Sequence, residues 1–389
     1  MTVPDRVGVG IVGTGFMAAT HTEALRRLGI DVIGMAGRTK ESAATAASAL
    51  AIPTAYSSFK DMLSDPAITA VHVTTPNDLH AEQVRAALDA GKHVVCEKPL
   101  GVDTTETAEL VLQAADSGLV NAVCFNIRFS PHVQNAAGLV QDGAIGQPRF
   151  VIGAYLQDWL LLETDWNWRL ASSRQGGLRA VADIGSHWLD LVQFVIGQRV
   201  ESVLADLHTF VPERNHPLHE VKTFAAAGVA DDAERVREQM NSDDAAGILL
   251  RFDDGARGVC AISQVSAGRK NRLTFEVDGS ESALGWTSED PEYLWVGHRG
   301  RPNEVIQTDA SLMSELGARS TGFPAGHVEG YPDSFKALFA TVYADIRAGA
   351  PSARPPYPTF ADGHDAVLVN EAIGASARTG SWTSVRRDR

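Results

Sequence analysis

The alternation of hydrophobic and polar positions changes in character about a third of the way along the chain. In the first 125 residues, short apolar runs are followed by segments with apolar residues at helical spacing. Such runs are typical of buried strands in a parallel sheet, and the segments between them are typical of covering helices. Strands are predicted near residues 7–11, 30–36, 70–75, 93–97 and 120–125, and later helices at 78–90 and 104–118. The pattern predicts an α/β domain with a doubly wound parallel sheet, a Rossmann domain, over residues 1–125.

After residue 125, longer alternating strands replace the short apolar runs. Strands are predicted at 149–158, 246–252, 257–264 and 272–278, and helices at 131–142, 186–197, 332–346 and 362–377. We expect the charged segment 231–244 to form a surface helix. Together these elements predict an α+β domain over residues 126–389, with a large, mostly antiparallel open sheet and helices on one face. The helix at 362–377 is expected to pack between the two domains.

The bulk composition restricts the class of protein. At 389 residues the chain is long enough for two cores, because single cores rarely exceed ~250–300 residues. A net charge of −14 argues against nucleic-acid binding. The three cysteines are too scattered for a disulfide framework or a paired metal spacing, so we expect reduced thiols and no metal. The first residues contain no hydrophobic signal segment, and no run approaches the ~20 apolar residues of a membrane span. We therefore expect a cytoplasmic protein.

The most specific motif lies directly after the first predicted strand. It reads Gly13-Thr14-Gly15-Phe16-Met17-Ala18 and opens a predicted helix. Gly13 allows the tight turn off the strand, Gly15 lets backbone approach a pyrophosphate, and Ala18 packs the helix against the sheet. The helix N-terminus then faces the anion. An ordinary turn is the alternative, but the order of strand, loop and helix favours a dinucleotide site.

The end of the second predicted strand bears on the choice of cofactor. An acidic side chain there would accept a hydrogen bond from the ribose 2′-hydroxyl of NAD. The chain has Arg38 instead, which could stack on adenine or pair with the 2′-phosphate of NADP. This leans towards NADP, whereas an Arg38 that points to solvent leaves NAD equally suitable, so both cofactors stay open.

Two further motifs carry groups suited to proton transfer. Lys98, in Glu97-Lys98-Pro99, follows a buried strand, where a lysine can hold a substrate oxygen or relay its proton. Asp183 and His187 are four residues apart, so a helix that begins near Asp183 places both on one face. A carboxylate beside an imidazole fixes its tautomer and favours a general base. The alternatives are a surface lysine, a pair of metal ligands, or an N-cap aspartate with a core histidine.

A tryptophan-rich segment offers candidate substrate contacts. Aromatic faces stack on the C–H side of sugars, while amide, acid and guanidinium groups bind hydroxyls. A tryptophan-rich core is the alternative. Arg169, Arg174 and Arg179 indicate either an anionic substrate group or a loop surface. The candidate substrate contacts are Asp158, Trp159, Trp166, Asn167, Trp168 and Arg169, with His327 and Tyr331 in a later polar loop.

Taken in order, the motifs resemble those of the Gfo/Idh/MocA oxidoreductase family, which contains glucose–fructose oxidoreductase and inositol dehydrogenase. The resemblance covers nearly the whole chain. It rests on the glycine motif with His21, on Thr75-Pro76-Asn77-Asp78-Leu79-His80, on Glu97-Lys98-Pro99 and on Asp183-Ile184-Gly185-Ser186-His187.

The resemblance implies roles for individual residues. Lys98, Asp183 and His187 would form the catalytic trio, and the Lys98-Pro99 peptide would be cis. Arg128 would lie at the substrate rim, where the preceding Ile127 departs from the aromatic or basic residue of many relatives. The open sheet face would form homodimers or homotetramers. The residues expected near the cofactor are Gly13, Thr14, Gly15, Phe16, Met17, Arg38, Thr75, Pro76, Asn77, His80, Glu97 and Lys98.

These observations lead to one function hypothesis and one main alternative. The first is an NAD(P)-dependent oxidoreductase that moves hydride between nicotinamide and a ring carbon, C3, of a sugar, glycoside or cyclitol. The alternative is an NAD-dependent glycosidase that oxidises C3 transiently, eliminates the C1 substituent, adds water and returns the hydride. It needs one more base, for which His327, Tyr331 and Tyr155 are candidates, and the arginines would suit an anionic glycoside. A cofactor-bound sensor without catalysis is disfavoured because Lys98 and His187 are both present.

Overall fold

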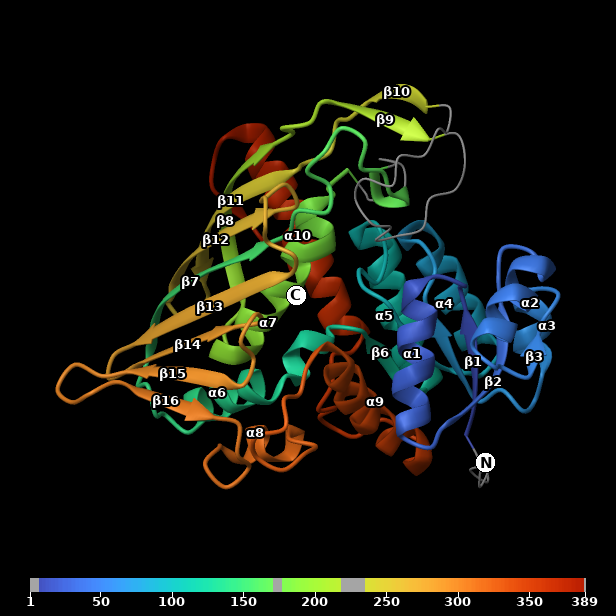
Figure 1. The fold of residues 1–389 in the computed structure, drawn as a ribbon, viewed down its shortest axis with the longest axis horizontal. Helices are drawn as coiled ribbons and strands as arrows, with labels where there is room; N and C mark the ends of the chain where they lie inside the picture. Colours follow the sequence, from blue (N-terminus) through green and yellow to red (C-terminus); the bar gives the residue numbers. More distant parts are fainter. Residues whose placement is uncertain (1–6, 171–176, 218–234, 388–389) are drawn as a thin grey trace. The chain divides into compact units, whose positions relative to one another are not determined.

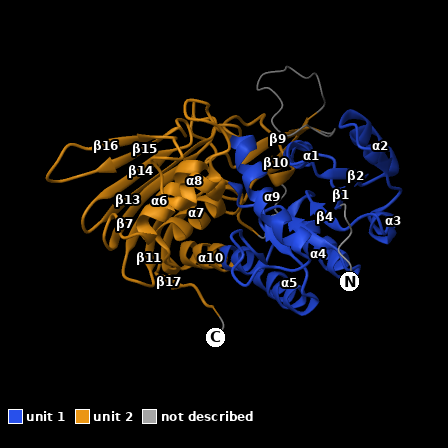
Figure 2. Cartoon of the chain, turned by 90° about the horizontal axis from the view of Figure 1, so that it is seen from below, with its two compact units in different colours: residues 1–126, 331–367 blue, residues 127–330, 368–389 orange. Residues whose placement is uncertain are grey.

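The computed structural model describes residues 7–170, 177–217 and 235–387. The chain divides into two compact units (Figure 2), which are described separately. Unit 1 contains residues 1–126 and 331–367, and unit 2 contains residues 127–330 and 368–389. The division falls within the helix α10, Phe360–Thr379.

Unit 1 is built on a six-stranded sheet in the order β3-β2-β1-β4-β5-β6, with every pair parallel (Figure 1). The strand order reverses direction between β1 and β4, which is the point where doubly wound sheets bind ligands. The predicted parallel sheet is thus confirmed. The strands are β1 Gly8–Val12, β2 Asp31–Ala36, β3 Thr54–Ala55, β4 Ala70–Val73, β5 His93–Cys96 and β6 Asn121–Val123.

The helices α1, α4 and α5 of unit 1 lie where the apolar spacing predicted them, and several helices of this unit have sequence signals at their ends. Thr39 and Ser42 form a capping box at the start of α2, and Asp103 caps α5. Gly118 ends α5 in the left-handed conformation that glycine favours. The helical segments are α1 Phe16–Arg27, α2 Lys40–Ala49, α3 Phe59–Ser64, η1 Asn77–Leu79, α4 His80–Asp89, α5 Thr104–Ser117 and α9 Tyr331–Ala348, with the first part of α10.

Unit 2 is built on a nine-stranded sheet in the order β16-β15-β14-β13-β7-β12-β11-β8-β17. Its pairs are antiparallel except for β7 with β12, which run parallel. The mostly antiparallel sheet is therefore confirmed. Its strands are β7 Pro148–Leu156, β8 Val200–His208, β11 Ala245–Phe252, β12 Arg257–Ser263, β13 Arg272–Gly279, β14 Ala283–Thr287, β15 Tyr293–Gly297, β16 Glu304–Gln307 and β17 Thr383–Ser384.

The core of unit 2 lies between this sheet and the helices on one of its faces. Trp188 of α7 is fully buried, and its Nε1 donates to the carbonyl oxygen of Thr274, 2.8 Å away. A side chain at Gly153 of β7 would collide with this indole, so glycine is required there. The helical segments are η2 Asn126–Phe129, α6 Pro131–Gln141, η3 Trp168–Leu170, the π-helical turn η5 Val181–Gly185, α7 Ser186–Ile196 and α8 Glu315–Ser320.

The prediction of a surface helix over 231–244 is wrong for the described part of that segment. Residues Arg235–Gln239 form the strand β10, which pairs antiparallel with β9, Glu213–Pro217. Residues 231–234 lie outside the described residues. The segment lacks an apolar stripe at helical spacing, so pairing with β9 outweighs the helix propensity of its charged residues.

Candidate active site

The glycine-rich turn of unit 1 has the geometry that a dinucleotide requires. Gly13 has φ +114°, and a Cβ there would lie 2.5 Å from Oγ1 of Thr74. Gly15, the N-cap of α1, is different, because a Cβ there would meet no atom of the described residues within 4 Å. Packing within the protein thus explains Gly13 but not Gly15. The open space before an α1 first turn without acidic residues fits a bound pyrophosphate.

The turn that follows β4 is tied to the turn that follows β5. His80 is fully buried, and its two ring nitrogens lie 2.7 Å from the carbonyl oxygen of Pro99 and 2.9 Å from that of Thr75. Burial lowers the pKa of His80. Asn77 of η1, three residues before His80, is also buried. His80 therefore holds together two of the segments expected near the nicotinamide.

Lys98 follows β5 on a turn whose backbone is held by the buried side chain of Glu97. The Lys98-Pro99 peptide is cis, as the family resemblance implies. Glu97 is buried, accepts a hydrogen bond from the Lys98 backbone N–H at 3.2 Å, and lies 3.0 Å from Nε2 of His21. The Lys98 side chain itself is half-buried. A rigid backbone thus carries a partly solvated amine, which suits a group that handles a substrate proton.

Other cofactor candidates of unit 1 lie around the same sheet edge. Arg38 is exposed two residues beyond β2. Phe16 is also exposed, at 47%. Tyr331, predicted as a substrate contact, opens α9, and its hydroxyl lies 3.8 Å from Sδ of Met17 in α1. Tyr331 is therefore placed beside a cofactor candidate.

In unit 2, Asp183 lies on the π-helical turn η5, directly before α7. Such turns occur often at functional sites. Its Oδ1 accepts from Nε of Arg169 at 3.1 Å, and its Oδ2 accepts from Nε2 of Gln264 at 2.8 Å. Asp183 does not cap α7, because Gly185 occupies the N-cap. Two donors, one of them a cation, favour the ionised carboxylate.

His187 is the second residue of α7 and is half-buried. Its ring centroid lies 6.3 Å from that of Tyr155 on β7. Burial raises the pKa of Tyr155, whose hydroxyl donates to Oδ1 of Asn271 at 2.7 Å. Tyr155 is thus poorly suited to act as an additional base. The pairing of His187 with Asp183 stays a prediction.

The tryptophan-rich segment surrounds Arg169 with aromatic rings. The guanidinium carbon lies 4.5 Å from the ring centroid of Trp168 and 6.0 Å from that of Trp159. Asn167, almost fully buried, accepts from the Arg169 backbone N–H at 3.1 Å. Trp166 instead stacks on His216 of β9, with centroids 3.8 Å apart. Arg169 therefore connects the aromatic residues to Asp183.

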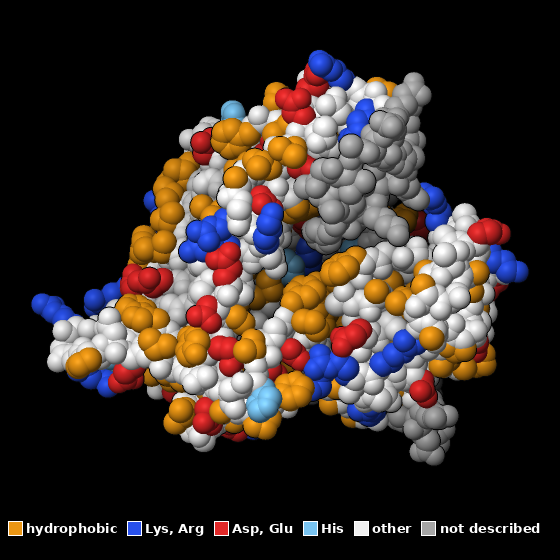
Figure 3. Space-filling view, in the orientation of Figure 1, with side chains coloured by type: hydrophobic (Ala, Val, Ile, Leu, Met, Phe, Trp, Pro, Cys, Tyr) orange, Lys and Arg blue, Asp and Glu red, His pale blue; other side chains and the backbone are white. Residues whose placement is uncertain are grey.

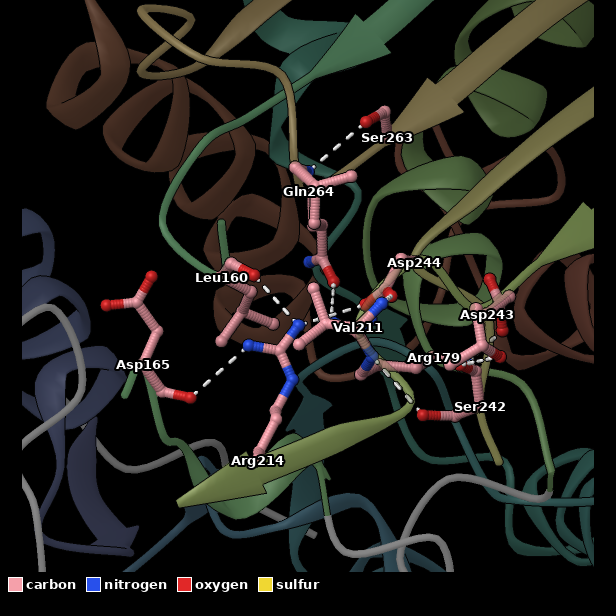
Figure 4. Close-up of polar contacts among 12 residues, drawn as sticks. Leu160, Asp165, Arg179, Val211, Arg214, Ser242, Asp243, Asp244, Ser263 and Gln264 are labelled. Carbon is pink, nitrogen blue, oxygen red and sulfur yellow. Dashed lines mark hydrogen bonds and ion pairs between the residues drawn. The ribbon is translucent and has the colours of Figure 1, made fainter. Parts of the chain in front are cut away.

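The predicted arginine cluster is not one site. Arg179 is fully buried and donates to Oε1 of Gln264 at 2.9 Å and to Oδ1 of Asp244 (Figure 4). Both predictions for Arg179, a loop surface and an anion-binding group, are wrong, because Asp244 compensates its charge inside the unit. Arg174 lies outside the described residues. Arg169 binds the Asp183 carboxylate directly, whereas the Arg179 side chain reaches it through Gln264.

Three further substrate candidates have contacts within unit 2. Arg128 binds Asp190 of α7 through both Nε, at 2.6 Å, and Nη2, which ties η2 to that helix. Asp158 accepts from Nζ of Lys270 at 2.8 Å. His327 is exposed, and its Nδ1 lies 3.0 Å from the carbonyl oxygen of Pro324. Their roles towards a substrate stay predictions.

One group of residues in the described part of the chain has donor atoms close enough to suggest a metal. It consists of His21, Glu97 and Cys124, all buried in unit 1. Burial raises the pKa of the Cys124 thiol, and Nε2 of His21 lies 3.8 Å from its sulfur. Hydrogen bonds account for these distances, so the group needs no ion.

Sequence reasoning missed Gln264 and Asp244, which contact the site from inside unit 2. Neither lies in a recognisable motif: Asp244 directly precedes β11, and Gln264 directly follows β12. The available signal was the pair Asp243-Asp244 beside an apolar strand, since buried carboxylates require cationic partners.

The glycine-rich turn on a parallel sheet, followed along the chain by a mostly antiparallel α/β unit, defines an NAD-binding oxidoreductase of two units. Comparison with known proteins agrees. Residues 7–125 match the oxidoreductase family with an NAD-binding Rossmann fold, and residues 133–284 match the GFO/IDH/MocA C-terminal domain. The chain belongs to the Gfo/Idh/MocA family.

Several known proteins resemble the chain over nearly its whole length. Levoglucosan dehydrogenase from Pseudarthrobacter phenanthrenivorans is 30% identical over 403 residues, which cover 98% of each chain. Myo-inositol 2-dehydrogenase from Thermotoga maritima is 25% identical over 95% of each chain. A levoglucosan dehydrogenase solved with NADH and levoglucosan has a TM-score of 0.86 and 28% identity, covering 99% of this chain and 100% of that one. An oxidoreductase domain protein from Kribbella flavida has a TM-score of 0.87 and 31% identity, covering 98% and 100%.

Among the described residues, no helix is both long enough and apolar enough to cross a membrane.

Proposed function

We propose that the chain is an NAD(H)-dependent dehydrogenase that oxidises a ring hydroxyl of a sugar, anhydrosugar or cyclitol, with C3 as the reacting carbon. The observation that carries the proposal is the position of Asp183, which lies on a π-helical turn four residues before His187 and accepts hydrogen bonds from Arg169 and Gln264. A carboxylate so placed can orient an imidazole that takes the hydroxyl proton. The full-length similarity to levoglucosan dehydrogenase supports the substrate class.

Each catalytic residue has a distinct task in this proposal. His187 accepts the proton of the substrate hydroxyl, and Asp183 orients its ring and stabilises the imidazolium that forms. Lys98 stabilises the developing alkoxide through its ammonium group or shares the proton. NAD⁺, when bound at the glycine-rich turn, supplies the hydride acceptor. Gly13 shapes that turn, and Gly15 leaves room for the phosphates.

We propose NAD(H) as the physiological cofactor. Structural relatives of the chain contain NADH. Arg38, exposed after β2, is the residue through which NADP could also be accepted, because a guanidinium can pair with a 2′-phosphate. The kcat/KM for NAD⁺ and for NADP⁺, measured in the wild type and in Arg38→Ala, identifies the preferred cofactor and the contribution of Arg38. A loss confined to NADP⁺ assigns the 2′-phosphate to Arg38.

For the substrate we propose an uncharged polyhydroxylated ring. Trp159 and Trp168 can stack on its C–H face, and the nearby polar groups can bind hydroxyls. The relatives include proteins named for levoglucosan and for myo-inositol, and one was solved with L-sorbose. An anionic glycoside is less suitable, because Arg179 is occupied inside unit 2.

The outer face of the nine-stranded sheet supports a homo-oligomer. Apolar side chains are exposed there among charged ones, and Figure 3 shows such a mixture over this sheet. A pocket of about 450 Å³ lies on the same face, lined in part by Ile152, Tyr293, Trp295 and Val305. We propose that a second copy of the chain covers this face, as exposed apolar patches often mark interfaces. Analytical ultracentrifugation tests it with Val305→Glu, which is expected to weaken self-association.

One assay distinguishes the dehydrogenase from the redox glycosidase. Levoglucosan, myo-inositol, glucose and nitrophenyl glycosides are incubated with enzyme and either cofactor, and absorbance at 340 nm and released nitrophenol are both recorded. NADH formed in proportion to the sugar consumed, without nitrophenol, supports the dehydrogenase. Release of nitrophenol with no net change at 340 nm would replace it with the glycosidase.

A further inference from the structure

A buried network in unit 2 connects Asp183 of the proposed site to the interior of the unit. Its centre is Asp244, which is almost fully buried. Oδ1 of Asp244 accepts from Nη2 of Arg179 and, at 3.1 Å, from Nη2 of Arg214, while Oδ2 accepts from the backbone N–H of Val211 at 2.8 Å. Both guanidinium groups are buried as well. Figure 4 shows the two arginines meeting at this carboxylate from opposite sides.

A second carboxylate fixes the backbone beside Arg179. Asp243 accepts from the backbone N–H of Arg179 at 2.6 Å and from that of Val181 at 2.8 Å. Asp244 thus compensates the two guanidinium groups, and Asp243 holds the backbone that enters the π-helical turn. Because uncompensated buried charge is costly, the network has few alternative arrangements.

Gln264 connects this network to Asp183 by hydrogen bonds from both ends of its amide. Its amide is fully buried, with Oε1 2.9 Å from Nη1 of Arg179 and Nε2 2.8 Å from Oδ2 of Asp183. A guanidinium only donates, so it must face the amide oxygen, and the amide nitrogen must then face Asp183. Asp183 as a carboxylate only accepts, which demands the same orientation. A flipped amide would place two donors together at one end and two acceptors at the other.

The backbone around Gln264 restricts its position further. Its N–H donates to the carbonyl oxygen of Asp244 at 3.0 Å. The two residues adjoin the paired residues Ser263 of β12 and Ala245 of β11. Gln264 is thus anchored to the sheet at its backbone and to Arg179 at its side chain. Asp183 receives one hydrogen bond from this rigid part and another from Arg169 in the tryptophan-rich segment.

We propose that Gln264 is a positioning residue that holds the carboxylate of Asp183 in the orientation needed by His187, and that Arg179 fixes the Gln264 amide for this task. The proposal rests on the proposed function for the roles of Asp183 and His187. Gln264 acts only through Asp183, so its loss has no further effect once the Asp183 carboxylate is gone.

The tautomer of His187 tests the proposal without a substrate. Ring-nitrogen shifts of His187 are recorded by long-range ¹H–¹⁵N correlation and assigned with His187→Gln. The variants are Gln264→Leu, Asp183→Asn and the double variant, with Gln198→Leu as a control at another buried glutamine, whose Oε1 accepts from Ala256 N. We expect a single tautomer of His187 in the wild type and in Gln198→Leu. Gln264→Leu, Asp183→Asn and the double variant are expected to give a mixture of tautomers, and the shifts of the double variant are expected to equal those of Asp183→Asn.

Other outcomes would overturn the proposal. Wild-type shifts in Gln264→Leu would show that Asp183 keeps its orientation without Gln264. Unchanged shifts in Asp183→Asn would show that Asp183 does not orient His187, and a larger effect in the double variant would show that Gln264 acts by another route. Gln264→Met guards against misfolding, because it keeps the side-chain length without the donor to Asp183 and places no charge beside that carboxylate. Its near-UV circular dichroism is expected to match that of the wild type, and it is expected to give the mixture of tautomers.

Kinetics with the best substrate of the sugar panel separate this proposal from the proposed function. If Gln264 positions Asp183, Gln264→Leu lowers kcat by ~10-fold or more and leaves the KM for NAD⁺ unchanged. If the wild-type enzyme reduces NAD⁺ with none of the sugars in the panel, the proposed function is refuted. The tautomer measurement would still decide the role of Gln264.

Discussion

Nε2 of His21 lies 3.0 Å from Oε1 of Glu97, and both side chains are buried in unit 1. The contact is one end of a chain, because Nδ1 of His21 lies 2.8 Å from Nδ1 of His72, whose Nε2 lies 2.8 Å from the hydroxyl of Tyr343. If Glu97 is ionised and His21 neutral, His21 donates to Glu97, His72 donates to His21, and Tyr343 donates to His72. Burial lowers the pKa of His72 far below its ordinary value, which agrees with a neutral ring.

The first prediction follows from this chain of donors. Tyr343→Phe leaves Nε2 of His72 buried without its donor, so the free energy of unfolding is expected to fall by about 1–3 kcal/mol. Urea unfolding measures the change. Tyr293→Phe, at an exposed position on β15, is the control and should be nearly neutral. Equal stability of the two variants would contradict the donor assignment.

The two glycines of the dinucleotide turn are predicted to respond differently to alanine. Gly13→Ala places Cβ 2.5 Å from Oγ1 of Thr74 at φ +114°, so a loss of stability of about 1–3 kcal/mol is expected. A Cβ at Gly15 has no described atom beyond its chain neighbours within 4 Å, so Gly15→Ala should leave the melting temperature unchanged while the Kd for NADH rises by about tenfold or more. Melting curves and NADH titration check both. Normal NADH binding by Gly15→Ala would argue against a pyrophosphate at this turn.

Removing the charge of Asp244 is predicted to destabilise unit 2. Asp244→Asn leaves Arg179 and Arg214 buried with one compensating carboxylate fewer, which costs about 3–5 kcal/mol. Asp254→Asn, at an exposed turn position, serves as the matched control. The midpoints of urea unfolding compare the two. A similar small change in both would show that the buried charges do not depend on Asp244.

Substitution of the proposed catalytic residues should separate turnover from cofactor binding. We expect His187→Ala and Lys98→Ala each to lower kcat by ~10²-fold or more, because each removes a group that handles the hydroxyl proton. NADH affinity should survive in both variants, as measured by fluorescence titration. Near-normal turnover in both variants would refute the site assignment.

Stability is predicted to fall in mild acid, partly because of His132. Burial lowers its pKa to about 4, while its Nε2 lies 2.9 Å from the carbonyl oxygen of Glu292. The unfolded chain binds a proton near the ordinary pKa of 6.5, so the contribution is present above that pH and is lost as the pH falls towards 4. At about 1.4 kcal/mol per pKa unit, the loss is roughly 3 kcal/mol. Urea unfolding at pH 7 and pH 4.5 measures it, and His132→Gln should flatten the dependence; an equally steep slope in that variant would assign the loss to other groups.

The elements with strong local signals were predictable. The strand that ends at Gly13 combines an apolar run with a glycine-rich turn, and α5 has both an aspartate cap and a terminal glycine. These signals involve only a few neighbouring residues, so they can be recognised in the sequence without knowledge of the fold. The segment 235–239 lacked them, and its pairing with β9, about twenty residues earlier, decided its conformation.

The candidate site was predictable only in its motifs. Asp183, His187 and Lys98 lie in short patterns that the sequence displays directly. Arg179 lies only four residues before Asp183, but its burial depends on Asp244 and Gln264, more than sixty residues further on. No local pattern reports such a contact.

The sequence by itself determined the parallel and antiparallel sheets, the glycine-rich turn and the candidates for proton transfer, because strand periodicity and turn chemistry are properties of neighbouring residues. Only the tertiary structure decided which charges are buried and what holds Asp183. A guanidinium can stay solvated or pair inside a core, and the choice depends on whether a carboxylate from a distant strand is brought within hydrogen-bond distance. In this chain, folding brings Asp244 to Arg179, and Gln264 connects that pair to Asp183.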